Sequence, residues 1–93
     1  MIIAVQTWDL HLPGCQSLKD KRSILQSLKQ GLRRSLNVAV SETDHQDLWQ
    51  RSTLGVVSVA SDPRILEQTL SSALRASEEV LERNLANYQI EYL

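Results

Sequence analysis

The sequence has few aromatic residues, a single cysteine and no long apolar run. Aromatic residues make up 4% of its 93 residues, and phenylalanine is absent. The core must therefore consist mainly of aliphatic side chains, and the two tryptophans carry much of any special packing or stacking. One cysteine cannot form an internal disulfide, which suits a reducing compartment.

Two further absences bear on location. No apolar run approaches the ~20 residues that a membrane-spanning helix needs. The first residues, Met1 to Val5, lack the basic region and cleavage pattern of a signal peptide. We therefore expect a cytoplasmic protein without a membrane segment, folded as a single domain over residues 1–93.

Charge is divided unevenly along the chain. The formal net charge is −1, which alone disfavours a general nucleic-acid binder. Residues 1–36 nevertheless carry six cationic side chains against two carboxylates, whereas the remainder carries four arginines against nine carboxylates. A chain divided in this way can present a basic face although its net charge is near zero.

The apolar pattern predicts an α+β fold. Residues 2–12 alternate between two faces, and residues 54–60 are apolar on both faces, which indicates a central strand. Gln6 falls on the buried face of the first strand, where a bulge or a polar partner is expected. Leucines at helical spacing predict helices over about 17–36, after Ser17, and from Asp62-Pro63 to about residue 84; further strands are expected over 37–43 and 86–93.

This order predicts a ferredoxin-like βαββαβ sandwich. Right-handed crossovers with a hairpin between them give a four-stranded antiparallel sheet that carries both helices on one face. The other face of the sheet is left for solvent or for a partner.

The segment Asp44-His45-Gln46-Asp47-Leu48-Trp49-Gln50-Arg51 stands out between the second and third strands. Hairpin connections are usually built from glycine, asparagine and proline, and this segment contains none of the three. It instead combines two carboxylates, an imidazole, an indole and a guanidinium. Its composition points to a role for the side chains beyond reversal of the backbone.

Three segments resemble a bacterial family of unknown function, the YlxP-like proteins. They are Met1-Ile2-Ile3 with His11-Leu12-Pro13-Gly14, then Ser17-Leu18-Lys19-Asp20-Lys21-Arg22, and residues 44–51. The resemblance implies a ferredoxin-like fold and a gene neighbourhood of translation-initiation and ribosome-maturation factors, including ribosome-binding factor A. It implies no established activity, cofactor or catalytic residue. Asp20 stands where the family more often has glutamate, which preserves the helix cap.

A basic stripe on the first helix is the first candidate site. Its nucleic-acid-binding candidates are Lys19, Lys21, Arg22, Lys29 and Arg33. Lys21 projects toward the apolar face, where its stem would cover core while its amine reaches water. The preceding Gly14 to Ser17 leads into a helix N-terminus, which favours anions, so the stripe could hold an RNA phosphate. The alternative is a solvated helix face paired with the acidic half of the chain.

Residues 44–51 are the second candidate site and have three interpretations. In the first, Trp49 caps the core and Arg51 pairs with Asp47 or Glu42. In the second, Trp49, Gln50 and Arg51 form an edge that stacks on a base or anchors a protein partner. In the third, Asp44, His45 and Asp47, with or without His11, bind a metal or act as acid and base, although their spacing matches no zinc signature.

These candidates favour a non-enzymatic binding protein that touches RNA or a ribosome-maturation factor through residues 17–36 and 44–51. A protein-interaction or self-association module without nucleic-acid binding is the alternative, and a small enzyme or metal site at Asp44, His45 and Asp47 is the third possibility. Cys15 is interpreted as structural, the alternative being a nucleophilic thiolate at a helix N-terminus. The sequence predicts no catalytic residue, no cofactor and no metal.

Overall fold

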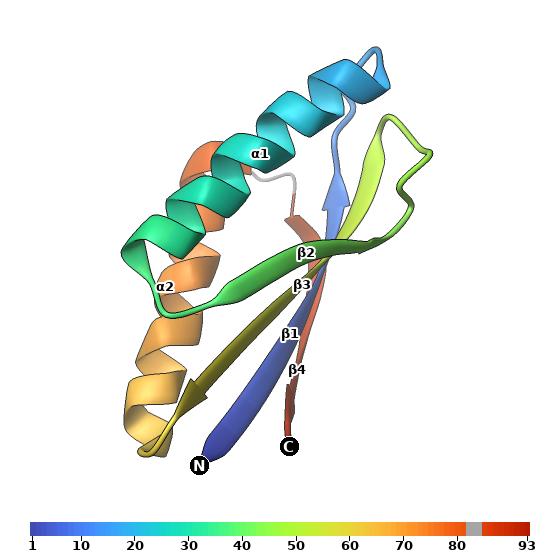
Figure 1. Cartoon of the computed structure of the whole chain (residues 1–93). Helices are drawn as coiled ribbons and strands as arrows, with labels where there is room; N and C mark the ends of the chain where they lie inside the picture. The colour runs from blue at the N-terminus through green and yellow to red at the C-terminus, as the bar shows by residue number, and fades with distance from the viewer. Residues whose placement is uncertain (82–84) are drawn as a thin grey trace.

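The computed structural model describes residues 1–81 and 85–93, which form one sheet and two helices (Figure 1). The elements are β1 (Ile2–His11), α1 (Leu18–Ser35), β2 (Ala39–Asp44), β3 (Arg51–Ala60), α2 (Pro63–Leu81) and β4 (Leu85–Tyr92). The strands pair antiparallel in the order β2-β3-β1-β4, and both helices lie on the same face of the sheet. The predicted βαββαβ architecture is confirmed.

The core lies between the helices and the alternating inward face of β1. Ala4, Gln6, Trp8 and Leu10 are buried, and the residues between them are at most partly covered, as a period of two requires. Helix α1 packs against this face through Leu25, Leu28 and Leu32, and α2 through Leu66, Leu70 and Ala73. Both helices thus bury one stripe of a 3.6-residue period.

Trp8 is the aromatic centre of this core and is fully buried. Its indole Nε1 donates to the Gln6 side-chain oxygen at 2.7 Å, so the oxygen of the buried amide has the polar partner that the sequence predicts, whereas its Nε2 makes no hydrogen bond among the described residues. The register shifts lie elsewhere, between Asp9 and Leu10 in the pairing of β1 with β4 and between Glu42 and Asp44 in the pairing of β2 with β3.

Helix starts follow the predicted capping chemistry. The Ser17 hydroxyl accepts from the Asp20 backbone N–H at 3.0 Å, and the Asp20 carboxylate accepts from the Gln16 N–H at 3.0 Å. Helix α2 begins at Pro63, and the Asp62 carboxylate accepts from the Arg64 N–H at 2.8 Å. Hydrogen bonds from the Arg64 side chain and backbone lower the pKa of Asp62. Each cap satisfies an amide that the helix itself leaves without a partner.

One element boundary differs from the prediction in a way that matters for the site. Strand β3 begins at Arg51, three residues before the predicted apolar run, because Arg51, Ser52 and Thr53 pair with His11, Leu10 and Asp9. The connection between β2 and β3 is therefore only residues 45–50, which we call the 45–50 loop. The predicted end of the second helix near residue 84 lies outside the described residues.

The second face of the sheet is uncovered among the described residues. Strand β3 is central, as predicted, but Val57 and Val59 on its outward side are 37% and 39% exposed. A shallow hollow of about 290 Å³ lies on this face between Val5, Gly55 and Val57 of the inner strands and Ala39 and Ser41 of β2. Neither α1 nor the described α2 combines the length and apolar character that crossing a membrane requires.

Candidate functional site

Three segments meet at one end of the molecule. The end of β1, the first turns of α1 and the 45–50 loop lie together, at the opposite end from the chain termini (Figure 1). The Leu12 N–H donates to the Gln50 carbonyl at 2.8 Å, and the Gln50 side-chain amide donates to the carbonyls of Pro13 and Cys15 at 3.3 and 3.2 Å. The loop is therefore tied directly to the turn that precedes α1.

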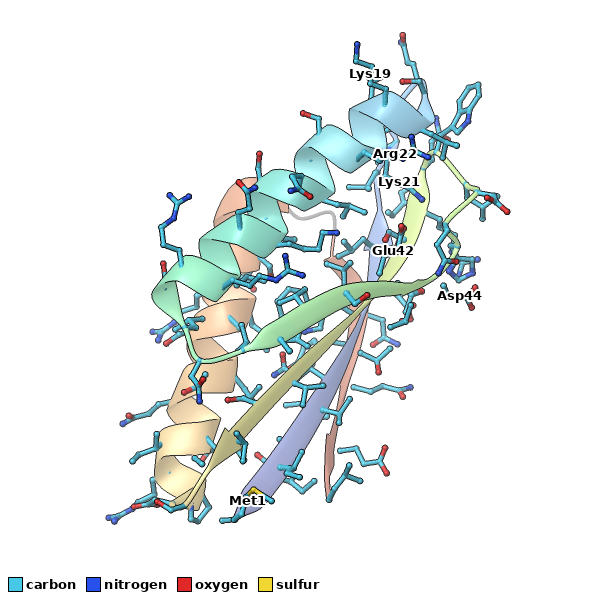
Figure 2. All side chains as sticks on the ribbon, in the orientation of Figure 1. Met1, Lys19, Lys21, Arg22, Glu42 and Asp44 are labelled. Carbon is cyan, nitrogen blue, oxygen red and sulfur yellow. The ribbon has the colours of Figure 1, made fainter. Side chains whose placement is uncertain are left out.

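The buried ammonium of Lys21 anchors the 45–50 loop. Its side chain is 1% exposed, and its ammonium donates to the carbonyls of His45, Gln46 and Arg51 at 2.8, 3.1 and 3.2 Å. The same ammonium lies 3.0 Å from the Glu42 carboxylate, toward which it points from α1 (Figure 2). The Glu42 carboxylate also accepts from the Ser52 hydroxyl at 2.6 Å. An ammonium has three protons, so four acceptors at these distances use all of its donor capacity.

The expectation that the Lys21 amine reaches water is wrong. Position 21 lies on the same helical stripe as Leu25, Leu28 and Leu32, and the loop carbonyls turn inward to meet it. Because the amine is buried and fully partnered, Lys21 does not belong to the nucleic-acid-binding candidates. Its contribution is to position the loop.

The loop holds a conformation that needs such support. His45 has a φ of 62°, in the left-handed region, which costs a non-glycine residue about 1–3 kcal/mol. The His45 carbonyl accepts from the Leu48 N–H at 3.1 Å as well as from Lys21, and the Asp44 carboxylate accepts from the His45 N–H at 2.7 Å. These bonds fix the backbone from which Leu48 and Trp49 project.

The interpretation of Trp49 as a core cap is wrong. Its side chain is 52% exposed and that of Leu48 is 46% exposed, whereas the tryptophan in the core is Trp8. The Lys21 ammonium, and not an indole, anchors the loop. A tryptophan held in water on a tethered loop is typical of a recognition surface.

The proposed ion pairs of Arg51 are also absent. Within residues 1–81 and 85–93, the carboxylate of Glu42 pairs with Lys21, and no carboxylate lies within 4.0 Å of the Arg51 guanidinium. Only the Arg51 backbone takes part in the anchoring. Its side chain joins the lining of a hollow of about 470 Å³ formed by His11, Asp47, Leu48, Trp49, Gln50 and Arg51, which we call the loop hollow.

Three members of the basic stripe come together in a second hollow. It measures about 430 Å³ and lies along α1, where Lys19 points into solvent and Arg22 lies toward the loop (Figure 2). We call it the α1 groove; its lining is Lys19, Arg22, Ser23, Leu25, Gln26, Lys29 and Glu42. Arg33 lies outside this set, because its guanidinium donates to the Val40 carbonyl at 2.6 Å and ties α1 to β2.

His45 belongs to a chain of polar groups that the sequence did not reveal. Its Nδ1 lies 2.9 Å from the Thr53 hydroxyl, which donates to the Asp9 carboxylate at 3.1 Å. Because the hydroxyl gives its only proton to Asp9, Nδ1 must donate, and the neutral ring keeps its acceptor at Nε2. Asp9 and Thr53 are cross-strand partners, so only knowledge of the register could have found them.

This arrangement differs from the predicted acid–base cluster. The carboxylate linked to His45 is Asp9, through Thr53, and Asp44 instead accepts from the His45 backbone. In the part of the chain that the structure describes, no three His, Cys, Asp or Glu side chains are placed to hold a metal ion.

Cys15 is buried, as its structural interpretation requires. Burial is the main cause that raises the pKa of its thiol, and the nearby Asp20 carboxylate raises it further, against a smaller opposing effect of Lys21. A raised pKa is the opposite of what an activated thiolate nucleophile needs.

The anchoring role of Lys21 predicts how its substitution changes stability. Lys21→Met takes the ammonium away from three carbonyls and from the partly buried Glu42 carboxylate, so it should lower the free energy of unfolding by about 3–5 kcal/mol. Urea denaturation followed by circular dichroism measures this. Lys19→Met, an exposed lysine on the same turn, is the control and should change stability by less than about 0.5 kcal/mol. Equal stability of the two variants would contradict the anchoring role.

Comparison with known proteins identifies a family without an activity. The family model described as Protein of unknown function (DUF503) matches residues 3–90. A curated relative, "Uncharacterized protein YlxP" of Bacillus subtilis (strain 168), is 36% identical over 58 residues, which make up 62% of this chain and 63% of that protein. The match thus spans less than two thirds of the relative's length.

Solved structures share the fold at low identity. A de novo designed protein with a ferredoxin fold aligns with all of this chain and 83% of its own, at a TM-score of 0.60 and 11% identity. The cofactor-independent oxygenase SnoaB from Streptomyces nogalater aligns over 99% and 89% of the two chains, at 0.54 and 13%. A C-terminal segment of the aIF2 alpha subunit from Pyrococcus abyssi aligns over 100% and 49%, at 0.52 and 15%.

Proteins of such different kinds show that the fold does not determine the function. The family match says more than this likeness of fold, because it runs through the α1 groove and the 45–50 loop as well as the sheet. This chain belongs to the DUF503 family of proteins of unknown function.

Proposed function

We propose that this protein binds RNA without catalysing a reaction, and that the α1 groove and the loop hollow together form its binding surface. The observation that carries the proposal is that the Lys21 ammonium contacts one lining residue of each hollow. Glu42, the ion-pair partner of Lys21, lines the α1 groove, and Arg51, whose carbonyl accepts from Lys21, lines the loop hollow. The cationic side chains of the α1 groove and the exposed Trp49 of the loop hollow therefore lie on either side of the Lys21 ammonium.

The charge of the α1 groove supports an anionic ligand. Its cations are Lys19, Arg22 and Lys29, and its only carboxylate, Glu42, lies 3.0 Å from the Lys21 ammonium. Because this internal pair cancels the carboxylate, the three cations keep their field toward solvent. Phosphate groups are held by such clusters even on a protein whose net charge is close to zero.

The exposed indole favours a nucleic acid over a small anion. Aromatic side chains that stack on bases contribute about 1–3 kcal/mol per base, and they act on single strands whose bases are unstacked. Trp49 is 52% exposed on a loop whose backbone is already tethered, so little conformational freedom remains to be lost on binding. The neighbourhood implied by the family resemblance leads us to propose RNA of the maturing ribosome as the natural ligand.

Salt dependence tests this proposal. Three phosphate contacts to a single strand predict a slope of about −2 in a plot of log affinity against log salt, which is about a 20-fold loss between roughly 50 and 200 mM. Fluorescence anisotropy of a labelled RNA of about ten nucleotides measures it. Arg22→Glu should weaken binding and make the slope shallower by about the amount that one phosphate contact contributes.

Arg75→Glu is the matched control for this experiment. It makes the same change of charge on an exposed position of α2, away from both hollows, and should leave the slope unchanged. Affinity that does not vary with salt, or equal effects of the two substitutions, would overturn the proposal.

Self-association is a second candidate because of the uncovered face of the sheet. Val57 and Val59 are exposed there beside a hollow of about 290 Å³. Two copies packed through this face would bury these side chains, and Val57→Lys would then separate them by placing a charge in the contact. Sedimentation equilibrium measures this: a dimer that Val57→Lys dissociates supports the candidate, and a monomer at high concentration removes it.

A further inference from the structure

The loop hollow contains two opposite charges that do not satisfy each other. Asp47 and Arg51 both line it, yet no nitrogen of Arg51 lies within 4.0 Å of the Asp47 carboxylate. Among the described residues, neither side chain makes a hydrogen bond to the protein, whereas the neighbouring side chains of Asp44, His45 and Gln50 all do. Of the polar side chains over residues 44–51, three are therefore used internally, and Asp47 and Arg51 are the two others that line the hollow.

Such a hollow is complementary to a flat group with donors on one edge and acceptors on another. The Trp49 indole offers an aromatic face, Asp47 accepts hydrogen bonds only, and Arg51 donates only. Its volume of about 470 Å³ lies within the range of sites that hold small organic groups, roughly 300–1,000 Å³.

Guanine has this pattern, and the other three RNA bases do not. Its Watson–Crick edge carries two adjacent donors, N1–H and the N2 amino group, which a carboxylate can accept together. Its adjoining major-groove edge carries the acceptors O6 and N7, which arginine commonly recognises. Adenine and cytosine place a lone pair beside their amino group, and uracil has one donor between two acceptors, so none of them offers a carboxylate two adjacent donors.

We propose that the loop hollow is the base-reading site of the RNA surface and that it selects an unpaired guanine. Trp49 stacks on the base, Asp47 accepts from N1–H and the N2 amino group, and Arg51 donates to O6 and N7. This inference rests on the proposed function and adds the identity of the base. The α1 groove holds the flanking phosphates without reading the sequence.

Intrinsic fluorescence gives a direct measurement, because one tryptophan is fully buried and the other is 52% exposed. The probes are three single-stranded RNAs of about ten nucleotides. Each contains uridines and one central base, which is guanine, inosine or adenine. Inosine differs from guanosine only in lacking the N2 amino group. Stacking should quench Trp49 alone, and the guanine RNA should bind about 5- to 150-fold more tightly than either of the others.

Two substitutions separate stacking from base reading. Trp49→Leu should abolish the quenching and weaken binding of all three RNAs. Asp47→Asn should reduce the preference for guanine over inosine to near unity while the salt slope stays unchanged. Glu67→Gln removes the charge of an exposed carboxylate on α2, outside both hollows, and should preserve the guanine preference.

The outcomes distinguish the two proposals. Salt-dependent binding with equal affinity for guanine, inosine and adenine overturns guanine selection and leaves RNA binding in place. Guanine-selective quenching that is independent of salt and survives Arg22→Glu supports the base site and overturns the phosphate-holding groove. Binding of none of the three RNAs at about 50 mM salt overturns both.

Discussion

The ammonium of Lys21 lies inside the molecule, 2.8 to 3.2 Å from three carbonyls and 3.0 Å from one carboxylate. Every other feature of the candidate site follows from this placement. The carbonyls belong to the first two residues of the 45–50 loop and to Arg51, the first residue of β3, so one side chain from α1 sets how the connection leaves β2 and enters β3. A charge in this position is tolerated only when its donors are used, and the loop folds inward to supply the acceptors. The left-handed backbone at His45 is part of that arrangement.

Internal use of these polar groups determines what faces solvent. Glu42 and Gln50 are occupied by Lys21 and by the turn before α1, and Asp44 holds the His45 backbone. The side chains left outward include the exposed Leu48 and Trp49, together with the charged groups of Asp47 and Arg51. On the other side of Lys21, its ion pair with Glu42 neutralises that carboxylate, which leaves the α1 groove positive. The same ion pair therefore stabilises the end of the sheet and lies between a side that carries the exposed Trp49 and a side that carries Lys19, Arg22 and Lys29.

The fold was predictable because each of its determinants is local. Alternation in β1, leucine spacing in α1, and the caps at Ser17 and Asp62 require no knowledge of distant contacts. The alternation over residues 2–12 puts Trp8 on the same face as Gln6, and both are buried. The sequence left the interpretations of Trp49 as a core cap and as a recognition edge both open, because a loop has no periodicity from which burial can be inferred. The sequence showed that Lys21 lies on the apolar stripe, but its acceptors are backbone carbonyls, which are present at every position and give no signal. The chain of His45, Thr53 and Asp9 depends on cross-strand register, which the pattern alone did not fix.

The central claim is that the 45–50 loop is a rigid platform and not a mobile connection. Nitrogen-15 relaxation of the free wild-type protein measures this directly, as backbone order parameters for residues 46–50. Tethering by Lys21 and Gln50 predicts values of about 0.85, equal to those of the flanking strands. Values below about 0.6 in the free protein would contradict the account, because Trp49 would then be presented by a flexible loop that Lys21 does not hold.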